Sequence, residues 1–370
     1  MARKKILKKL SYYSISTLII LVLAEIILSL CNIFPNDYYA HTPNMRQSFD
    51  ENPSKIGGIT GFYEIAFDAL GSRSVSDYTK ASHKIVALGG STTICSALTQ
   101  EKTWTALLDK KLGTNYWVGN FGRSGNSSNH HVVQFQHILD KPELQDTKIV
   151  LLLVVVNDCR GYLFAKEKYL NMSNLEIKRG AFKHIPNAEL PFFRRLTLYK
   201  LAKQARLRIL YYTQPKRPLD YLQTFENKTT PIAELPDLTE GLNHYEQNLI
   251  QIINEAQQRN ITLIFMTQPT IWQKNLSDEL KTLLAARAHY NKTPLYTGEA
   301  LEEIMTAFNK RLVAVCNTYN IPLIDLELLK NQPIFYDDMH FHEAGAEVVA
   351  EKVYSFLKQH NHVATDEYKN

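Results

Sequence analysis

Cysteine is scarce in this chain, and neither sign of charge is in strong excess. Four cysteines occur among 370 residues, at Cys31, Cys95, Cys159 and Cys316, so a hydrophobic core rather than a disulfide framework must hold the fold. The formal net charge is only +5, and the sequence has neither zinc-finger spacing nor an RNA-binding signature, so we expect no nucleic acid partner. Internal repeats and low-complexity tracts are absent too, which leaves an ordinary folded protein.

A long apolar run is present at the N-terminus. Four lysines between positions 4 and 9 precede a stretch that is apolar from about Ile15 to Phe34. Twenty helical residues span roughly 30 Å, the thickness of a bilayer's hydrocarbon core. Basic residues hold their flank in the cytoplasm. We therefore expect a single-pass anchor in the cytoplasmic membrane, with the N-terminus inside and the rest of the chain outside, in the periplasm if the cell is Gram-negative.

Two alternatives to this anchor stay open. A cleaved signal peptide needs a shorter apolar region and a small-x-small site, and none is well placed. A lipoprotein signal needs a small residue before its cysteine, but Leu30 precedes Cys31. Glu25 lies within the run, where a central charge costs about 2.5–3.5 kcal/mol on insertion scales; it either faces a partner helix or is simply tolerated.

The chain is expected to divide into five parts. The expected parts are a cytoplasmic basic tail at 1–11, a transmembrane anchor at 12–34, an irregular extracytoplasmic lead-in at 35–82, a main domain at 83–360 and a short tail at 361–370. A basic insertion at 161–238 interrupts the main domain. Its segment Gly161–Arg217 carries thirteen Lys and Arg against three Glu, which fits either a solvated insertion or a contact with a membrane surface or an anionic glycan.

Short apolar runs alternate with amphipathic helices through the main domain. The runs are Lys84–Leu88, Tyr116–Phe121, Ile149–Val156, Ile261–Met266 and Ile321–Asp325. This alternation predicts an α/β fold, a flavodoxin-like doubly wound sheet of five parallel strands in the order 2-1-3-4-5, flanked by helices. The third run is apolar on both faces and should lie at the sheet's centre. The functional site of such a sheet lies beyond the carboxyl ends of its strands.

Polar motifs follow the first three strands. Gly90-Ser91 opens a helix after the first strand, where free N–H groups favour a nucleophile and its oxyanion, although a helix-capping serine would look the same. Gly125 lies in the loop after the second strand, and its backbone N–H can approach a substrate closely. Asn157 ends the third strand, where its amide can donate to an oxyanion or form an ordinary Asx turn.

A fourth polar motif precedes the last helix. There His340 can act as a general base, and Asp337 can orient it. A rival interpretation is a metal cluster of Asp337, Asp338, His340 and His342. No ligand motif elsewhere supports that cluster, so we expect no metal and no cofactor.

Together these motifs resemble the four blocks of the SGNH (GDSL-type) hydrolase family, over about Lys84 to Leu357. The resemblance implies Ser91 as nucleophile, His340 as base and Asp337 as its partner. It also implies an oxyanion hole made by the N–H groups of Ser91 and Gly125 and the side chain of Asn157.

The chain departs from the usual family pattern at two positions. Gly90 stands where the first block usually has aspartate, and Val155 stands where the third block usually has glycine. The Gly-Gly-Ser-Thr form resembles a membrane-anchored bacterial subset of the family, as do Phe67–Arg73 and Thr267-Gln268-Pro269.

The resemblance and the expected compartment imply an extracytoplasmic serine ester hydrolase. Its substrate would be an acylated small molecule or glycan, and we expect it to remove O-acyl groups, acetyl above all, from an envelope glycan. An O-acyltransferase using the same triad and a non-catalytic envelope scaffold remain alternatives. The oligomeric state is not specified. Cys95 and Cys159 follow neighbouring strands and could form a disulfide, but we favour free thiols because bridging needs Cα atoms within about 7 Å.

Overall fold

The computed structural model describes residues 2–50, 57–213, 231–277, 280, 296–330 and 332–363. Parts of the predicted lead-in (51–56), basic insertion (214–230) and C-terminal tail (364–370) lie outside the described residues. In chain order the elements are α1 (Ala2–Leu30), β1 (Arg46–Asp50), β2 (Phe62–Ala66), β3 (His83–Gly89), α2 (Ser91–Ile94), η2 (Gln100–Lys102), α3 (Trp104–Leu112), β4 (Tyr116–Asn120), α4 (Ser128–Leu139), η3 (Pro142–Leu144), β5 (Ile149–Leu153), α5 (Val156–Leu170), α6 (Asn174–Ala181), η4 (Asn187–Glu189), α7 (Phe192–Arg195), α8 (Thr197–Thr213), α9 (Thr239–Gln258), β6 (Thr262–Met266), α11 (Gly298–Tyr319), β7 (Leu323–Ile324), η7 (Glu327–Leu329) and α12 (Glu343–Gln359).

The chain divides into two compact units. The helical unit comprises Met1–Tyr38 and His184–Lys216, and the sheet unit comprises Tyr39–Lys183 and Arg217–Asn370. The helical unit therefore takes α1 from one end of the chain and η4, α7 and α8 from its middle.

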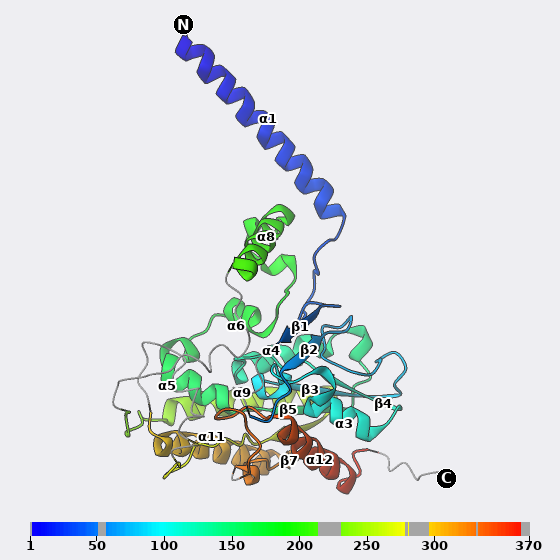
Figure 1. The fold of residues 1–370 in the computed structure, drawn as a ribbon, viewed down its shortest axis with the longest axis vertical. Helices are drawn as coiled ribbons and strands as arrows, with labels where there is room; N and C mark the ends of the chain where they lie inside the picture. Colours follow the sequence, from blue (N-terminus) through cyan, green and yellow to red (C-terminus); the bar gives the residue numbers. More distant parts are fainter. Residues whose placement is uncertain are drawn as a thin grey trace. The chain divides into compact units, whose positions relative to one another are not determined.

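A five-stranded parallel sheet forms the centre of the sheet unit, in the order β4-β3-β5-β6-β7. Counted along the five strands, this is the order 2-1-3-4-5, so the predicted flavodoxin-like sheet is confirmed (Figure 1). The central strand β5 has the sequence IVLLL, and all of its residues are buried. A strand covered by helices on both faces has this all-apolar character.

Helices cover both faces of the sheet. α3 and α12 pack against each other on one face, whereas α4 packs on α9 and α9 on α11 on the other (Figure 1). In α9 the buried side chains recur every three or four residues, at Tyr245, Leu249, Ile252, Ile253 and Ala256. That spacing gives the helix one apolar face, which it turns to the core.

The strand register brings three strand ends to one edge of the sheet. Ala87 of β3 pairs with Asn120 of β4, and Gly89 of β3 pairs with Leu153 of β5. The residues that follow these strands, including Ser91, therefore lie at the same edge. This edge is where a doubly wound sheet places its functional site.

The lead-in differs from its predicted irregular form, because β1 and β2 pair there as antiparallel strands. Residues of β2 alternate between exposed or half-buried and buried positions, and Tyr63 and Ile65 pack with Phe67 and Ile94 in a small apolar cluster. Three strands also end earlier than predicted, among them β4, which stops at Asn120 rather than Phe121. β5 stops at Leu153, before α5 begins at Val156, and β7 consists of Leu323 and Ile324 alone.

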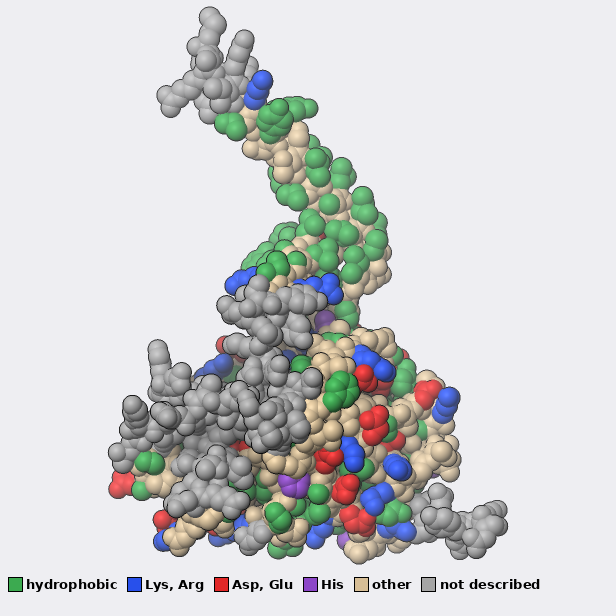
Figure 2. Space-filling model, viewed as in Figure 1, with side chains coloured by type: hydrophobic (Ala, Val, Ile, Leu, Met, Phe, Trp, Pro, Cys, Tyr) green, Lys and Arg blue, Asp and Glu red, His purple; other side chains and the backbone are tan. Residues whose placement is uncertain are grey.

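One N-terminal helix is long and apolar enough to cross a membrane, over Lys9–Leu30. Figure 2 shows apolar side chains along the visible face of this helix. The helix begins before the predicted anchor at residue 12 and ends before its predicted limit at residue 34. It ends where Asn32 takes a positive φ of 47°, a left-handed conformation that a right-handed helix cannot continue through.

The four cysteines are free thiols. Cys95 Sγ lies 3.3 Å from the carbonyl oxygen of Thr92, and Cys159 Sγ lies 3.9 Å from that of Ile304. The two thiols thus contact different parts of the core, in agreement with the favoured expectation.

Candidate active site

Ser91, His340 and Asp337 form a continuous chain of hydrogen bonds. His340 Nε2 lies 2.7 Å from Ser91 Oγ, and His340 Nδ1 lies 2.6 Å from Asp337 Oδ2. The other carboxylate oxygen of Asp337 accepts the backbone N–H groups of His340 at 2.7 Å and Met339 at 2.9 Å. Both oxygens of this carboxylate are therefore engaged, which fixes the plane of the imidazole and aims Nε2 at the serine.

Two opposing effects act on His340. Burial of the ring lowers its pKa, but the charge of Asp337 and the hydrogen bond to it outweigh burial, so the pKa of His340 is raised above its ordinary 6.5. The side chain of Asp337 is 1% exposed and that of His340 is 16% exposed. A nearly dry carboxylate thus stabilises the imidazolium that would form if the ring took a proton from the serine.

Ser91 is placed by the tight turn between β3 and the short helix α2. Ser91 itself is half-buried. A Cβ atom on the preceding Gly90 would lie 2.4 Å from Asn157 Nδ2 and 3.5 Å from the carbonyl oxygen of Asn126. A side chain at position 90 would therefore displace the Asn157 amide, so glycine at this position lets the amide lie against the turn.

The other two predicted oxyanion donors come from the start of α5 and from the loop after β4. Asn157 lies in the first turn of α5 rather than at the end of a strand, and its Nδ2 donates to the carbonyl oxygen of Asn126 at 2.8 Å. Gly125, the residue before Asn126, is exposed and has a φ of 83°. The contact of Gly90 with Asn157 and Asn126 brings these two loops against the turn that carries Ser91.

Val155 has an unusual backbone conformation at the start of α5. Its φ is 101° and its ψ is −63°, and its side chain is 1% exposed. A positive φ at a β-branched residue costs of order 1–3 kcal/mol and persists only where the surroundings enforce it. The family's usual glycine would adopt this conformation without that cost.

A second layer of polar side chains supports the residues next to Ser91 and Asp337. Thr92 Oγ1 donates to Gln268 Oε1 at 3.0 Å, and Trp272 Nε1 donates to Asp338 Oδ2 at 2.8 Å. Burial, together with the adjacent charge of Asp337, raises the pKa of Asp338 to about 7. The segment after β6 thus supports both ends of the hydrogen-bonded chain, although the sequence indicated only that Thr267-Gln268-Pro269 resembles a family segment.

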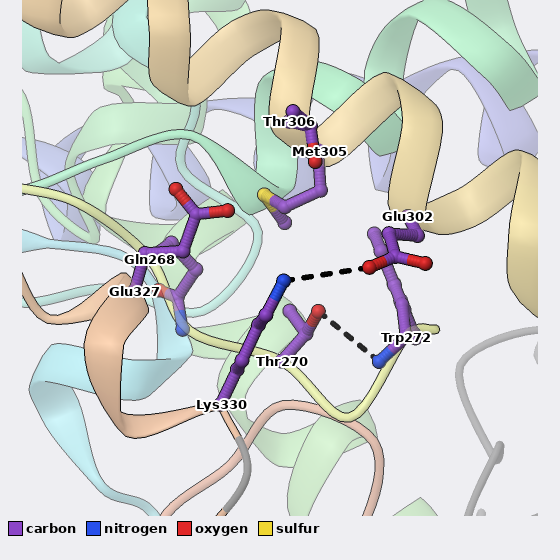
Figure 3. A pocket seen from close by; sticks show the side chains of 8 residues that line it. All are labelled: Gln268, Thr270, Trp272, Glu302, Met305, Thr306, Glu327 and Lys330. Atoms are coloured by element: carbon purple, nitrogen blue, oxygen red, sulfur yellow. Dashed lines mark hydrogen bonds and ion pairs between the residues drawn. The ribbon is translucent and has the colours of Figure 1, made fainter. Parts of the chain in front are cut away.

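Gln268 and Trp272 also line a shallow pocket of about 210 Å³, a volume that includes open solvent (Figure 3). The remaining lining residues are Thr270, Glu302, Met305, Thr306, Glu327 and Lys330. The ion pair between Lys330 Nζ and Glu302 Oε1, 3.4 Å apart, bridges two of its walls. Neither Ser91 nor His340 lines this pocket, so it is not where the predicted nucleophile would act.

The rival metal cluster is not assembled. His342 caps α12, because its Nδ1 accepts the N–H of Gly345 at 3.0 Å, while its Nε2 lies 2.7 Å from the carbonyl oxygen of Pro333. Asp338 is held by Trp272. Across the part of the chain that the structure describes, no group of three or more His, Cys, Asp or Glu side chains could hold a metal ion.

Arg73 supports the turn that follows Ser91, and sequence reasoning missed this role. Its guanidinium donates to the carbonyl oxygens of Ile94, Cys95 and Leu98 at 2.6, 2.8 and 2.5 Å. Burial lowers the pKa of Arg73 to about 10, which still leaves the group charged at neutral pH. A buried cation at the carboxyl end of α2 stabilises the carbonyl groups there. The sequence signal was only that Phe67–Arg73 resembles a family segment, which says nothing of these partners.

A model of the GDSL-like lipase/acylhydrolase family matches residues 87–348. Comparison with curated proteins gave no match. One similar solved structure is an acetylxylan esterase from Geobacillus stearothermophilus, with 14% identity, 76% of this chain and 96% of that chain covered, and a TM-score of 0.41. Another is a member of the lipolytic protein G-D-S-L family from Veillonella parvula DSM 2008, with 13% identity, coverage of 75% and 99%, and a TM-score of 0.40. A third is an alpha/beta hydrolase enzyme from the metagenome of Lake Arreo, with 14% identity, coverage of 76% and 97%, and a TM-score of 0.41.

Proposed function

The chain belongs to the GDSL-like lipase/acylhydrolase family, and we propose that it is a membrane-tethered serine esterase that removes O-acyl groups, acetyl above all, from a glycan of the cell envelope. The observation that carries the proposal is the hydrogen-bonded chain from Ser91 through His340 to Asp337. A serine hydroxyl is a weak nucleophile until an adjacent base takes its proton, and this contact supplies the base.

In the first half of the proposed reaction, Ser91 Oγ attacks the acyl carbonyl carbon while its proton passes to His340 Nε2. The negative charge that forms on the carbonyl oxygen is stabilised by the N–H groups of Ser91 and Gly125 and by the Asn157 amide. When the intermediate collapses, the bond to the alcohol oxygen breaks. That oxygen takes the proton from His340, and the acyl group stays on Ser91.

In the second half, His340 takes a proton from a water molecule that attacks the acyl-serine. Collapse of the second intermediate breaks the bond to Ser91 Oγ, returns the proton to that oxygen and releases the carboxylic acid. Asp337 remains ionised throughout and stabilises the imidazolium each time it forms. The overall change is one ester and one water converted to one acid and one alcohol.

Two features support a polymeric substrate outside the cytoplasm. Ser91 is half-buried and Gly125 is exposed, so an acyl group protruding from a large glycan can reach the nucleophile. The apolar helix α1 could hold the chain in the membrane, and the lysines that precede its apolar run would keep that end in the cytoplasm. The catalytic unit would then face the polysaccharides of the envelope.

The test compares Ser91→Ala with Ser355→Ala, a serine on α12 whose hydroxyl donates to Glu351 within its own helix. Both variants and the wild type are incubated with an acetylated glycan and with a small acetyl ester, and acetate release is measured. We expect Ser91→Ala to lose several orders of magnitude in kcat and Ser355→Ala to keep full activity. Activity of Ser91→Ala within about tenfold of wild type would refute the assignment.

Two further measurements on the same proteins separate hydrolysis from its alternatives. One is the mass of the protein after covalent labelling, and the other is transfer of the acetyl group to an added glycan. A fluorophosphonate should add to wild type and to Ser355→Ala but not to Ser91→Ala, because it reacts with an activated serine. Absence of labelling in wild type would favour the scaffold alternative. Transfer of the acetyl group to an added glycan, in preference to release of free acetate, would show that the same triad serves an acyltransferase.

A further inference from the structure

Glu25 of the apolar helix α1 has specific partners within the helical unit. Its two carboxylate oxygens accept the backbone N–H groups of Thr197, at 2.6 Å, and Leu198, at 2.9 Å, which are the first residues of α8. N–H groups in the first turn of a helix have no partner within that helix and carry partial positive charge. The carboxylate therefore caps α8, and α8 begins at the level of Glu25 along α1.

That level corresponds to a defined depth. Glu25 lies five residues before Leu30, the outer end of the stretch long enough to cross a membrane, which at about 1.5 Å per helical residue is roughly 8 Å. Amphipathic helices that lie in a membrane interface bury their apolar face about 5–10 Å into the boundary between headgroups and acyl chains. The start of α8 is thus at the depth where such helices lie.

The faces of α8 differ in chemistry. At about 100° per residue, Leu198, Leu201, Ala202, Ala205 and Ile209 fall within an arc of roughly 100°. Ala202, Ala205 and Ile209 are exposed, Ile209 at 63%. Lys203 lies on the opposite side of the helix and Arg206 lies about 40° beyond the Ala202 edge of this arc, and both are exposed. Leu207, 50% exposed, also lies opposite the arc.

The short helix α7 in front of α8 continues this pattern. Phe192 and Phe193 are 77% and 53% exposed. Residues 191–209 contain six Lys and Arg and no Asp or Glu. Figure 2 shows blue basic and green apolar side chains next to one another on this segment. Exposed aromatic and aliphatic side chains beside a one-signed basic charge are characteristic of a surface for anionic lipid.

Residues that follow α1 in the helical unit also contact the segment that contains α8. Asn36 Oδ1 accepts the N–H of Asn187 at 2.6 Å, and Lys200 Nζ donates to Asn187 Oδ1 at 2.6 Å. The ammonium group of Lys200 also lies 5.5 Å from the centre of the Phe34 ring. The segment after α1 and the segment that includes α8 are therefore joined at several points besides Glu25.

We propose that residues 192–213, the interfacial segment, lie in the outer membrane–water boundary beside α1, with their apolar face among the acyl chains and their exposed lysines and arginines among anionic phospholipid headgroups. This inference rests on the membrane tethering in the proposed function. It gives Glu25 a function, because the carboxylate within the apolar helix fixes the start of α8 within the interfacial segment. The protein then holds the membrane through two elements, one spanning and one lying along its surface.

The test uses the full chain reconstituted into vesicles of phosphatidylcholine and phosphatidylglycerol, with or without bromine on the acyl chains. Bromine quenches only tryptophans that reach the acyl region. The native Trp104, Trp117 and Trp272 are at most 3% exposed, so an added tryptophan provides the signal. The variants are Phe193→Trp and Ile209→Trp, with Leu328→Trp, 68% exposed in the sheet unit, as the matched control.

We expect brominated lipid to quench the added tryptophan at 193 and at 209 but not at 328. Absence of quenching at 193 and 209, or equal quenching at all three positions, overturns the proposal. In the Ile209→Trp background, reversing Lys203 and Arg206 to glutamate should reduce quenching on vesicles that contain phosphatidylglycerol. The same reversal at Lys110 and Lys310, exposed lysines of α3 and α11, should not. An equal effect of the two reversals refutes the headgroup contact.

A fractionation step separates failure of this inference from failure of the proposed tethering. Protein recovered in solution after alkaline washing, without its first residues, would show that α1 is a cleaved signal, and the tethering itself would fail. Protein that stays with the membrane while the tryptophans at 193 and 209 escape quenching would overturn the interfacial segment alone.

Discussion

Replacing Val155 by glycine should cost much less stability than a buried valine normally does. The Val155 side chain is 1% exposed, and losing the burial of such a side chain costs about 1.5–3 kcal/mol. The freedom that glycine loses on folding adds about 0.5–1 kcal/mol. Against this, the φ of 101° is relieved, which offsets about 1–3 kcal/mol. The expected net loss is therefore about 1 kcal/mol.

The neighbouring Val154 is the matched control. It is 3% exposed and is not among the described residues with a positive φ, so Val154→Gly should lose the same burial without relief of strain, about 3 kcal/mol in all. The difference between the two variants isolates the backbone term, because the atoms removed are the same.

Urea unfolding of the full chain in detergent measures both changes. The three tryptophans are buried in the sheet unit, so their fluorescence follows the unfolding of that unit alone. The shift in midpoint, multiplied by the common slope, gives the change in the free energy of unfolding. A loss for Val155→Gly equal to that for Val154→Gly would mean that no strain is stored at the start of α5.

Further predictions concern the candidate site. Asn157→Ala should lower kcat by about 10²–10³ with little change in KM, as for loss of one oxyanion donor; an effect on KM alone would make Asn157 a substrate-binding residue. Gly90→Ala should lower kcat too, because the new Cβ would lie 2.4 Å from Asn157 Nδ2 and displace that amide. If the losses of Gly90→Ala and Asn157→Ala were additive in the variant that combines them, the two positions would not act through the same amide. Burial lowers the pKa of His340, but Asp337 raises it by more than burial lowers it, so the net pKa lies above 6.5. The value of kcat/KM should therefore increase as the pH increases through that pKa and His340 becomes neutral. In Asp337→Asn the rise should move to lower pH and kcat should fall by about 10⁴; an unmoved pH profile would show that Asp337 does not act on His340. Below pH 6.5 the interaction of His340 with Asp337 makes its full contribution to the free energy of unfolding. This contribution should be lost as the pH rises through the raised pKa, which unfolding midpoints measured across that range would show.

The layout of the sheet could be predicted because it depends on local patterns. The run from Ile149 is apolar at every position, which is typical of a strand covered on both faces, and the structure places it at the centre of the sheet. The β1–β2 pair was missed because each strand has five residues and β2 is stabilised by tertiary contacts, those of Tyr63 and Ile65 with Ile94. Such contacts leave little trace in a short stretch of sequence.

The candidate site could be predicted as a set of residues, because the ends of parallel strands share one edge. The packing of the site could not be predicted. Gly90 and Asn157 come into contact where neighbouring strands end, and the spacing of residues along the sequence does not specify that contact. The same holds for Arg73, whose partners Ile94 and Leu98 lie more than twenty positions away. The positive φ at Val155 contradicts the residue's own preference and follows only from the surrounding structure.

The hydrogen-bonded chain joins residues from opposite ends of the sheet unit. Ser91 follows β3, the first strand of the parallel sheet, while His340 stands before α12, and 249 positions separate them. Closing so long a loop costs chain entropy that only the intervening sheet and helices can offset. A chain is synthesised from its N-terminus, so Ser91 leaves the ribosome long before its base exists. A nascent chain, or a fragment ending before residue 340, would carry an unactivated alcohol at position 91, and the proposed ester cleavage could begin only after synthesis has passed His340.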